Sequence, residues 1–240
     1  MNLRPVNMKI PFRAILLWLL TASCAQATNM LTNGSFDSTS LGSIRRFTTG
    51  QNISGWTVVG PAVLLINGNY REPYHGASFN AEDGPNALDI TGVGNEGTSA
   101  GVWQTISTVM GQDYSLSFFV GRASSTNNSV AYANPASIDL SIDNGARTTY
   151  TNSNSNTILG LIDWQEFTTV FTANSTITKI SFYNAMLGLT SYAGLDNVSL
   201  SPVTLAAVPE PAMTGLLGTG IGLLWMIRRR KSEQETRLIG

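Results

Sequence analysis

The chain has 240 residues, with 14 basic and 15 acidic side chains, one histidine and one cysteine. Between residues 28 and 208 six basic residues stand against twelve acidic ones, a net charge of −6 that the near-neutral whole chain hides. So acidic a stretch lacks the basic surface that nucleic-acid binding requires, and a single histidine excludes zinc sites built on several histidines.

The first predicted element is a secretory signal peptide over residues 1–27. Three basic residues precede the apolar run of residues 14–20 (AILLWLL), and residues 25–27 (AQA) supply a small-x-small site for signal peptidase. The run is shorter than the roughly 20 residues of a membrane-spanning helix. The only cysteine, Cys24, lies in this segment, so we expect a mature chain without disulfide or thiol chemistry. Lipidation at Cys24 is the alternative to simple cleavage.

Residues 28–202 predict one all-β domain. Short runs are separated by Gly, Asn, Pro and Ser, and no helical period is sustained. Apolar and polar residues alternate over residues 114–120 and 138–142, as in strands with one buried face. The other predicted strands are residues 62–66, 102–106, 146–150, 167–172, 177–183 and 197–200. Seven to nine such strands predict a jelly-roll β-sandwich.

Two kinds of connection are predicted within this domain. Residues 143–145 (DNG) carry an Asn-Gly hairpin signal, because a type I′ turn needs positive φ at both central residues. The polar segments 124–129 and 151–157 are too polar to be buried and are predicted as mobile loops at the rim of the sandwich.

Several short motifs make this domain similar to the galactose-binding-like jelly rolls of carbohydrate-binding modules and plant cell-wall-associated domains. They are residues 31–37 (LTNGSFD), 54–56 (SGW), 103–105 (WQT), 163–164 (DW) and 194–198 (GLDNV). The resemblance implies a sugar-binding ancestry. It also implies that Asp37 and Asp196 hold a structural calcium ion together with backbone carbonyls. The alternative is that each aspartate caps its own turn.

Sugar binding requires an aromatic face against the pyranose ring and polar groups for its hydroxyls. The aromatic candidates near turns are Tyr70, Tyr74, Trp103 and Tyr132, with Asn69, Asn80 and Gln104 as polar partners. Trp56, Trp164 and Phe182 are expected in the core, and Trp103 also suits the core. Sequence alone does not group these residues into one site.

Little in the sequence indicates catalysis. His75 lies in a loop-like segment, where a lone imidazole is more often a surface residue than a base. Glu82 with Asp83, or Glu96 with another acid, would be needed as a glycosidase pair, but the required spacing between carboxyl groups is a property of the fold. Neither Gly-x-Ser-x-Gly nor a phosphate loop occurs. We therefore expect a protein that is not an enzyme.

The last predicted elements form a membrane tail in three parts. A linker of residues 203–211 ends in Val208, Pro209, Glu210 and Pro211; a single transmembrane helix spans residues 212–227; and a tail of residues 228–240 begins with Arg228, Arg229, Arg230 and Lys231. A basic cluster after an apolar helix stays on the cytoplasmic side. Sixteen residues rise only about 24 Å, less than the hydrocarbon core of about 30 Å, which predicts a weak anchor.

These three parts, in this order, resemble the PEP-CTERM sorting signal. The resemblance implies an exosortase substrate, cleaved near Pro211, in a Gram-negative cell that makes exopolysaccharide. We therefore expect a protein held briefly at the inner membrane and then placed on the cell surface or in the biofilm matrix, where the sandwich binds or packs with extracellular polysaccharide. A purely structural coat protein acting through protein contacts is the main alternative, and a glycoside-active enzyme is the other.

Overall fold

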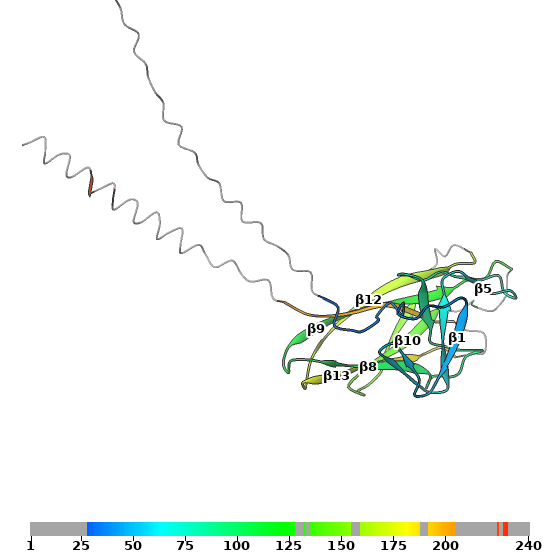
Figure 1. Ribbon diagram of the computed structural model, residues 1–240, viewed down its shortest axis with the longest axis horizontal. Helices are drawn as coiled ribbons and strands as arrows, with labels where there is room; N and C mark the ends of the chain where they lie inside the picture. Colours follow the sequence, from blue (N-terminus) through cyan, green and yellow to red (C-terminus); the bar gives the residue numbers. More distant parts are fainter. Residues whose placement is uncertain are drawn as a thin grey trace, which may run out of the picture.

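A computed structural model describes residues 28–127, 132, 135–154, 159–187, 192–204, 225 and 228–229. Over these residues the chain forms fourteen strands in two six-stranded sheets and one two-stranded sheet, and every pairing between strands is antiparallel. The two large sheets lie face to face as a β-sandwich (Figure 1). The predicted all-β sandwich is confirmed.

The order of strands in the first sheet is β1 (Ile44–Thr48), β4 (Ala62–Asn67), β7 (Asn86–Asp89), β14 (Gly194–Pro202), β9 (Asp113–Ala123) and β12 (Ile162–Thr172). The order in the second is β11 (Thr148–Asn152), β10 (Ala136–Ile142), β13 (Ile177–Asn184), β8 (Gly101–Ser107), β3 (Trp56–Val59) and β2 (Asn52–Ile53). A separate hairpin joins β5 (Tyr70–Arg71) and β6 (Ser78–Phe79). From β7 onward, each connection except that of β10 to β11 crosses between the two large sheets, which is jelly-roll winding.

The main core lies between the two large sheets and follows from the alternation of apolar residues. Leu116, Phe118 and Val120 of β9 point inward and are fully buried, while the residues between them are half-buried. Trp56 and Phe182, both predicted in the core, are also fully buried, with ring centroids 6.1 Å apart. Each buried side chain of this size contributes about 1.5–3 kcal/mol relative to an exposed one.

Asn29 and the motif of residues 31–37 hold the start of the domain against the last strand, β14. The Asn29 side chain donates to the carbonyl of Val198 at 2.9 Å and accepts from the amide of Leu200 at 2.9 Å. A Cβ on Gly34 would lie 1.9 Å from the carbonyl oxygen of Val198, so only glycine permits this approach. The two ends of the family-like motif set therefore meet at β14.

The hairpin between β10 and β11 differs from its prediction by one residue. The central residues of the turn are Asp143 and Asn144, with φ of 51° and 57°, and the amide of Gly145 closes the turn on the carbonyl of Ile142 at 2.8 Å. Asp and Asn both tolerate the left-handed region, so the pair can take the centre without glycine. The returning strand consequently begins at Thr148 instead of residue 146.

The two predicted polar loops are only partly exposed. Thr151 and Asn152 belong to β11. Asn152 is completely buried, and its side-chain amide donates to the carbonyls of Val120 and Asp163. A buried amide is tolerated when its hydrogen bonds are satisfied. Ser125 and Asn127 also bond to other segments instead of remaining free. Residues 128–129 and 155–157 of these loops lie outside the described residues.

The predicted signal peptide, the Pro-Glu-Pro motif and nearly all of the predicted membrane segment and basic tail lie outside the described residues as well. Of residues 205–240 only Trp225, Arg228 and Arg229 are described, and all three are helical. Across the residues that the structure covers, no helix has the length and apolar character to cross a bilayer.

Candidate functional site

A second apolar cluster lies on the outer face of the first sheet, near β4. Val63 and Leu65 of this strand point into the main core, whereas Leu64 and Ile66 point outward and are nevertheless buried. A continuous apolar strand is expected where both faces of a sheet are covered. Here the outer cover includes the β5–β6 hairpin, which brings Phe79 against Leu64 and Ile66 in the cluster.

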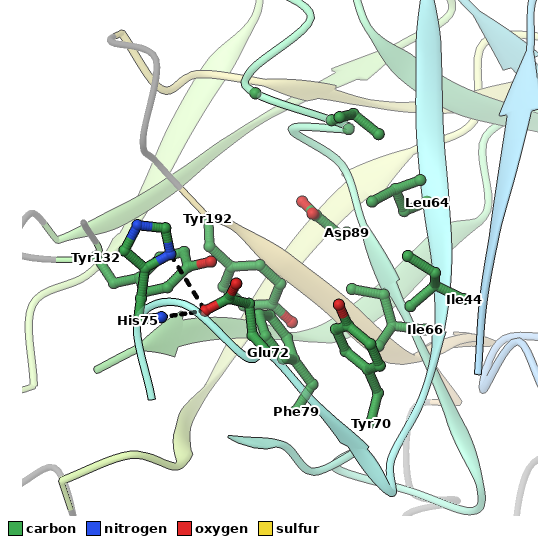
Figure 2. A pocket seen from close by; sticks show the side chains of 13 residues that line it. Ile44, Leu64, Ile66, Tyr70, Glu72, His75, Phe79, Asp89, Tyr132 and Tyr192 are labelled. Carbon is green, nitrogen blue, oxygen red and sulfur yellow. Dashed lines mark hydrogen bonds and ion pairs between the residues drawn. The ribbon is translucent and has the colours of Figure 1, made fainter. Parts of the chain in front are cut away.

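This cover leaves a cavity of about 320 Å³. Its lining consists of aromatic, aliphatic, acidic and glycine residues together with one histidine, namely Ile44, Leu64, Ile66, Tyr70, Glu72, His75, Phe79, Asp89, Gly92, Val93, Gly94, Tyr132 and Tyr192. Figure 2 shows Ile44, Leu64 and Ile66 on one side, Tyr132, Tyr192 and His75 on the other, and the Asp89 carboxyl group between them, with Tyr70 beside Ile66. The volume is at the lower end of the range for small-molecule sites.

The rings of Tyr70, Phe79, Tyr132 and Tyr192 form a continuous wall, in which the last three pack edge against face and Tyr70 is tilted against Phe79. The Phe79 ring lies 4.9 Å from that of Tyr192 and 5.8 Å from that of Tyr70, measured between centroids. The Tyr132 ring is perpendicular to that of Tyr192 at 6.5 Å, and it is also perpendicular to the imidazole of His75 at 5.8 Å. Such pairs are favourable beyond their buried area, so each ring holds the next in place.

The His75 corner is held by an acidic side chain and by a neighbouring segment. Glu72 accepts from the amide of Tyr74 at 3.0 Å through Oε1, and its Oε2 lies 3.1 Å from His75 Nδ1. Ser125 Oγ donates to the carbonyl of His75 at 2.6 Å, and Asn127 donates to that of Tyr74 at 2.9 Å. The His75 side chain is 36% exposed, so it lies at the surface as well as in the lining of the cavity.

Asp89 places a buried carboxyl group at the cavity. The residue is 6% exposed, and its Oδ1 accepts from the Thr91 amide at 2.9 Å and from the Thr91 hydroxyl at 2.5 Å. Burial raises the pKa of Asp89 to about 7, although hydrogen bonds from Thr91 and Gly92 act in the opposite direction. The group therefore changes its charge near neutral pH.

The tyrosine hydroxyl groups of the cavity remain protonated. Burial raises the pKa of Tyr70, Tyr132 and Tyr192, and the charges of nearby acids raise it further. Glu72 acts on Tyr70 and Tyr132, and Asp89 acts on Tyr132 and Tyr192. These hydroxyl groups are thus available as hydrogen-bond donors at any physiological pH.

The structure brings together two of the four aromatic residues proposed for sugar binding. Tyr70 and Tyr132 line the cavity, whereas Tyr74 points away from it and is 80% exposed. Trp103 is half-buried in the second sheet, where Lys179 Nζ lies 4.6 Å from its ring centroid. Trp103 is therefore neither in the core nor near the cavity.

Two of the three proposed polar partners, Asn80 and Gln104, have structural roles in the described part of the chain. Asn80 bonds through both side-chain atoms to the backbone of Ile162, at 2.8 and 3.3 Å, and its carbonyl accepts from Trp164 Nε1. Gln104 is 7% exposed and bonds to both the amide and the carbonyl of Thr32. Asn69 is exposed, and none of the three lines the cavity.

Of the thirteen lining residues only Tyr70 and Tyr132 were proposed as ligand contacts from the sequence, and the polar and aromatic ones that it did not propose are Glu72, His75, Phe79, Asp89 and Tyr192. One signal for them was present. The run of residues 62–66 (AVLLI) is apolar at every position, which requires a cover on both faces of the sheet. The aromatic-rich segment that follows, residues 70–79, is the natural source of that cover.

Asp37 and Asp196, predicted as calcium ligands, meet in the fold. Asp196 is completely buried, and its carboxylate accepts from the amides of Glu82, Asp83 and Asn197 at 2.9, 3.2 and 2.7 Å. Burial raises the pKa of Asp196 to about 8, and the charge of Asp37 raises it further. A cation bound between the two carboxylates would offset their mutual repulsion.

The donor atoms around these two aspartates suit calcium better than a softer metal. Asp37 accepts from the Asn86 amide at 2.9 Å, and Asn86 Oδ1 is buried without a hydrogen-bond partner among the described residues. Calcium takes carboxylate, amide and carbonyl oxygens. No group of three or more His, Cys, Asp or Glu side chains able to hold a metal occurs in the described ranges, so carbonyl oxygens would have to complete the shell.

Three solved structures align with most of this chain at low sequence identity. A CBM4 structure aligns at 18% identity, covering 72% of this chain and 99% of that one, with a TM-score of 0.38. The CBM22-1 xylan-binding domain of Paenibacillus barcinonensis Xyn10C aligns at 15% identity, covering 75% and 97%, with a TM-score of 0.41. TmCBM61 in complex with β-1,4-galactotriose aligns at 14% identity, covering 74% and 100%, with a TM-score of 0.40.

Sequence comparison places the chain in a family without giving it an activity. No curated protein matches it significantly. Residues 29–200, which span the whole sandwich, match the model of a family described as a protein of unknown function, DUF642. The chain is therefore a member of the DUF642 family.

Proposed function

We propose that this protein binds a carbohydrate in the cavity between β4 and the segment of residues 70–79, and that it does so outside the cell on exopolysaccharide. The observation that carries the proposal is the aromatic wall of Tyr70, Phe79, Tyr132 and Tyr192 facing a space that also contains hydroxyl and carboxyl groups.

The chemistry of a sugar matches this combination. A pyranose ring presents apolar C–H groups that pack on aromatic rings, while its hydroxyl groups need both donors and acceptors. Tyrosine hydroxyls kept protonated by burial donate, and Asp89 accepts. With about 320 Å³, the cavity has room for about one or two sugar residues of a longer chain.

The proposal is for binding and not for catalysis. Both oxygens of Glu72 are occupied, since Oε1 accepts from the Tyr74 amide and Oε2 contacts His75 through its amide and its ring. Asp89 Oδ1 is bound twice by Thr91. A glycosidase needs one carboxyl group free to protonate the bond and another free to act on the sugar or on water.

The proposal also includes export and sorting. A signal peptide over residues 1–27 would send the sandwich across the inner membrane, and the tail beginning at Val208 would hold it there for an exosortase. Support comes from the order of the Pro-Glu-Pro motif, the apolar segment and the basic cluster at the end of the chain. The sandwich would then reach the cell surface or matrix of a Gram-negative bacterium, where polysaccharide is available.

Binding is tested with the full chain purified in a detergent that carries no sugar, because glycosidic detergents would compete for the cavity. Retention is measured on the host's own exopolysaccharide and on a glycan array. Tyr132→Ala should reduce retention at least tenfold, since it removes one ring of the wall. Trp103→Ala is the matched control, because it removes an aromatic side chain from the other sheet.

Two outcomes would end the proposal: no retention of the wild-type chain on any glycan, or equal loss in both variants. If light scattering shows self-association that does not change when glycan is added, the result would instead support a structural coat protein acting through protein contacts.

A further inference from the structure

Charge is distributed unevenly around the cavity. Its lining includes two carboxyl groups, those of Glu72 and Asp89, and it includes neither lysine nor arginine among the residues that the structure describes there. His75 is the single basic group in the lining, and its Nδ1 already faces Glu72 at 3.1 Å. When Asp89 is ionised, no group in the lining offsets its charge.

The arginines next to the cavity do not supply that offset. Arg46 precedes the buried part of β1 and pairs with Leu64 in register, but its guanidinium is bound to Glu96 at 2.8 Å. Arg71 donates from Nη1 to the carbonyl of Tyr70 at 3.1 Å and is exposed. The hydrogen bonds to Asp89 come from Thr91 and Gly92, which are neutral donors.

The aromatic wall adds to the negative electrostatic potential that the carboxyl groups create in the cavity. The face of each ring carries partial negative charge, so rings around a cavity attract a cation. The charge of Asp89 raises the pKa of both Tyr132 and Tyr192, and the charge of Glu72 also raises the pKa of Tyr132. Rings together with carboxylates are the combination that recognises an ammonium group.

We propose that the ligand of this cavity is an amino sugar, a hexosamine residue with a free, protonated amine within a de-N-acetylated stretch of polysaccharide. The inference rests on the proposed sugar binding and specifies its class. The ammonium lies toward Asp89 and the ring packs against the wall of Tyr132 and Tyr192. An acidic sugar would be repelled, and a neutral or N-acetylated sugar would leave the buried Asp89 without a counter-charge.

Protonation sets the expected pH dependence. The ionisable side chains that line the cavity are Glu72, His75, Asp89 and the three tyrosines. Ionisation of Asp89 on raising the pH from 5.5 to 7.5 adds the counter-charge. Binding of the amino sugar therefore tightens over this interval, until the amine of the ligand itself loses its proton.

The test is isothermal titration calorimetry on the full chain in phosphate buffer with 0.15 M salt. Amine buffers are omitted because they would compete, and the salt screens weak attraction to the acidic surface. The probes are a glucosamine trisaccharide, the N-acetylglucosamine trisaccharide, a cellotriose and n-butylamine. We expect the glucosamine trisaccharide to bind at least tenfold more tightly than each of the other three.

Three variants separate the cavity from the surface charge. Asp89→Asn and Glu72→Gln should each weaken glucosamine binding at least tenfold, while binding of the N-acetylated trisaccharide stays within about threefold. Glu166→Gln is the control, because it removes one acid that is exposed on β12 and does not line the cavity. The comparison of ligands on the wild-type chain remains decisive if a variant fails to fold.

Each alternative outcome overturns a different part. Equal affinity for the neutral or N-acetylated trisaccharide removes the charge inference and leaves the proposed sugar binding intact. Equal affinity for n-butylamine shows that the sugar ring is not recognised. An equal effect of Glu166→Gln and Asp89→Asn shows attraction to the surface only. Failure of every saccharide to bind removes both the inference and the proposed function.

Discussion

Replacing Asp89 by Asn should change how the stability of the domain depends on pH. The carboxyl group has a pKa of about 7 in the folded chain, compared with 3.8 when it is freely solvated. The folded state therefore keeps its proton between these two pH values, while the unfolded state releases it. The free energy of unfolding falls as the pH rises through this window and levels off above about pH 7.

The size of the effect follows from the two pKa values. A difference between about 7 and 3.8 corresponds to roughly 4 kcal/mol of stability lost once Asp89 is ionised. Asparagine keeps an oxygen for the two hydrogen bonds from Thr91 and carries no charge at any pH. Relative to the wild type, Asp89→Asn should therefore gain roughly 4 kcal/mol between pH 3.5 and pH 8.

The measurement is guanidinium chloride unfolding at pH 3.5, 5, 6.5 and 8 in calcium-free buffer, followed by tryptophan fluorescence, since Trp56 is completely buried. The difference between wild type and variant cancels the titration of all other groups. A difference that stays constant within about 0.5 kcal/mol across this range would refute the reasoning, because Asp89 would then be equally ionised in both states.

Three further predictions concern other parts of the chain. Calcium at a concentration of 100 times its Kd should stabilise the wild type by about 2.7 kcal/mol in thermal unfolding, and Asp37→Asn should abolish this gain. Equal stability with calcium and with a chelator would contradict a calcium site. Gly84→Ala should destabilise the domain by at least about 1–2 kcal/mol in denaturant unfolding, because Gly84 has φ of +63° and an added Cβ would lie 1.7 Å from Asp37 Oδ2. The control is Gly94→Ala, which is also at positive φ but in open space and therefore measures the cost of the backbone conformation alone. Mass spectrometry of the surface-exposed protein should find a C-terminus near Pro211, and an intact end at Gly240 would argue against exosortase processing.

Local patterns were sufficient to predict the sandwich. Alternation along β9 and β10 identified inward residues such as Phe118 and Ile138, because successive side chains of a strand point to opposite faces. Six strands were not predicted: β2, β5 and β6, in which two residues carry no period, and β1, β3 and β7, which have only four or five residues each. The hairpin at Asp143 was predicted one residue out of place, because both Asp-Asn and Asn-Gly can occupy its centre.

The sequence by itself also determined the charge balance, the core position of Trp56 and the two aspartates that meet near β14. Only the tertiary structure decided where a ligand fits. Tyr132 and Tyr192 reach the cavity from positions far along the chain from Tyr70, and no local pattern encodes that meeting. The pKa of Asp89 is likewise set by burial at the cavity, so an aspartate that looks ordinary in sequence changes its charge near neutral pH.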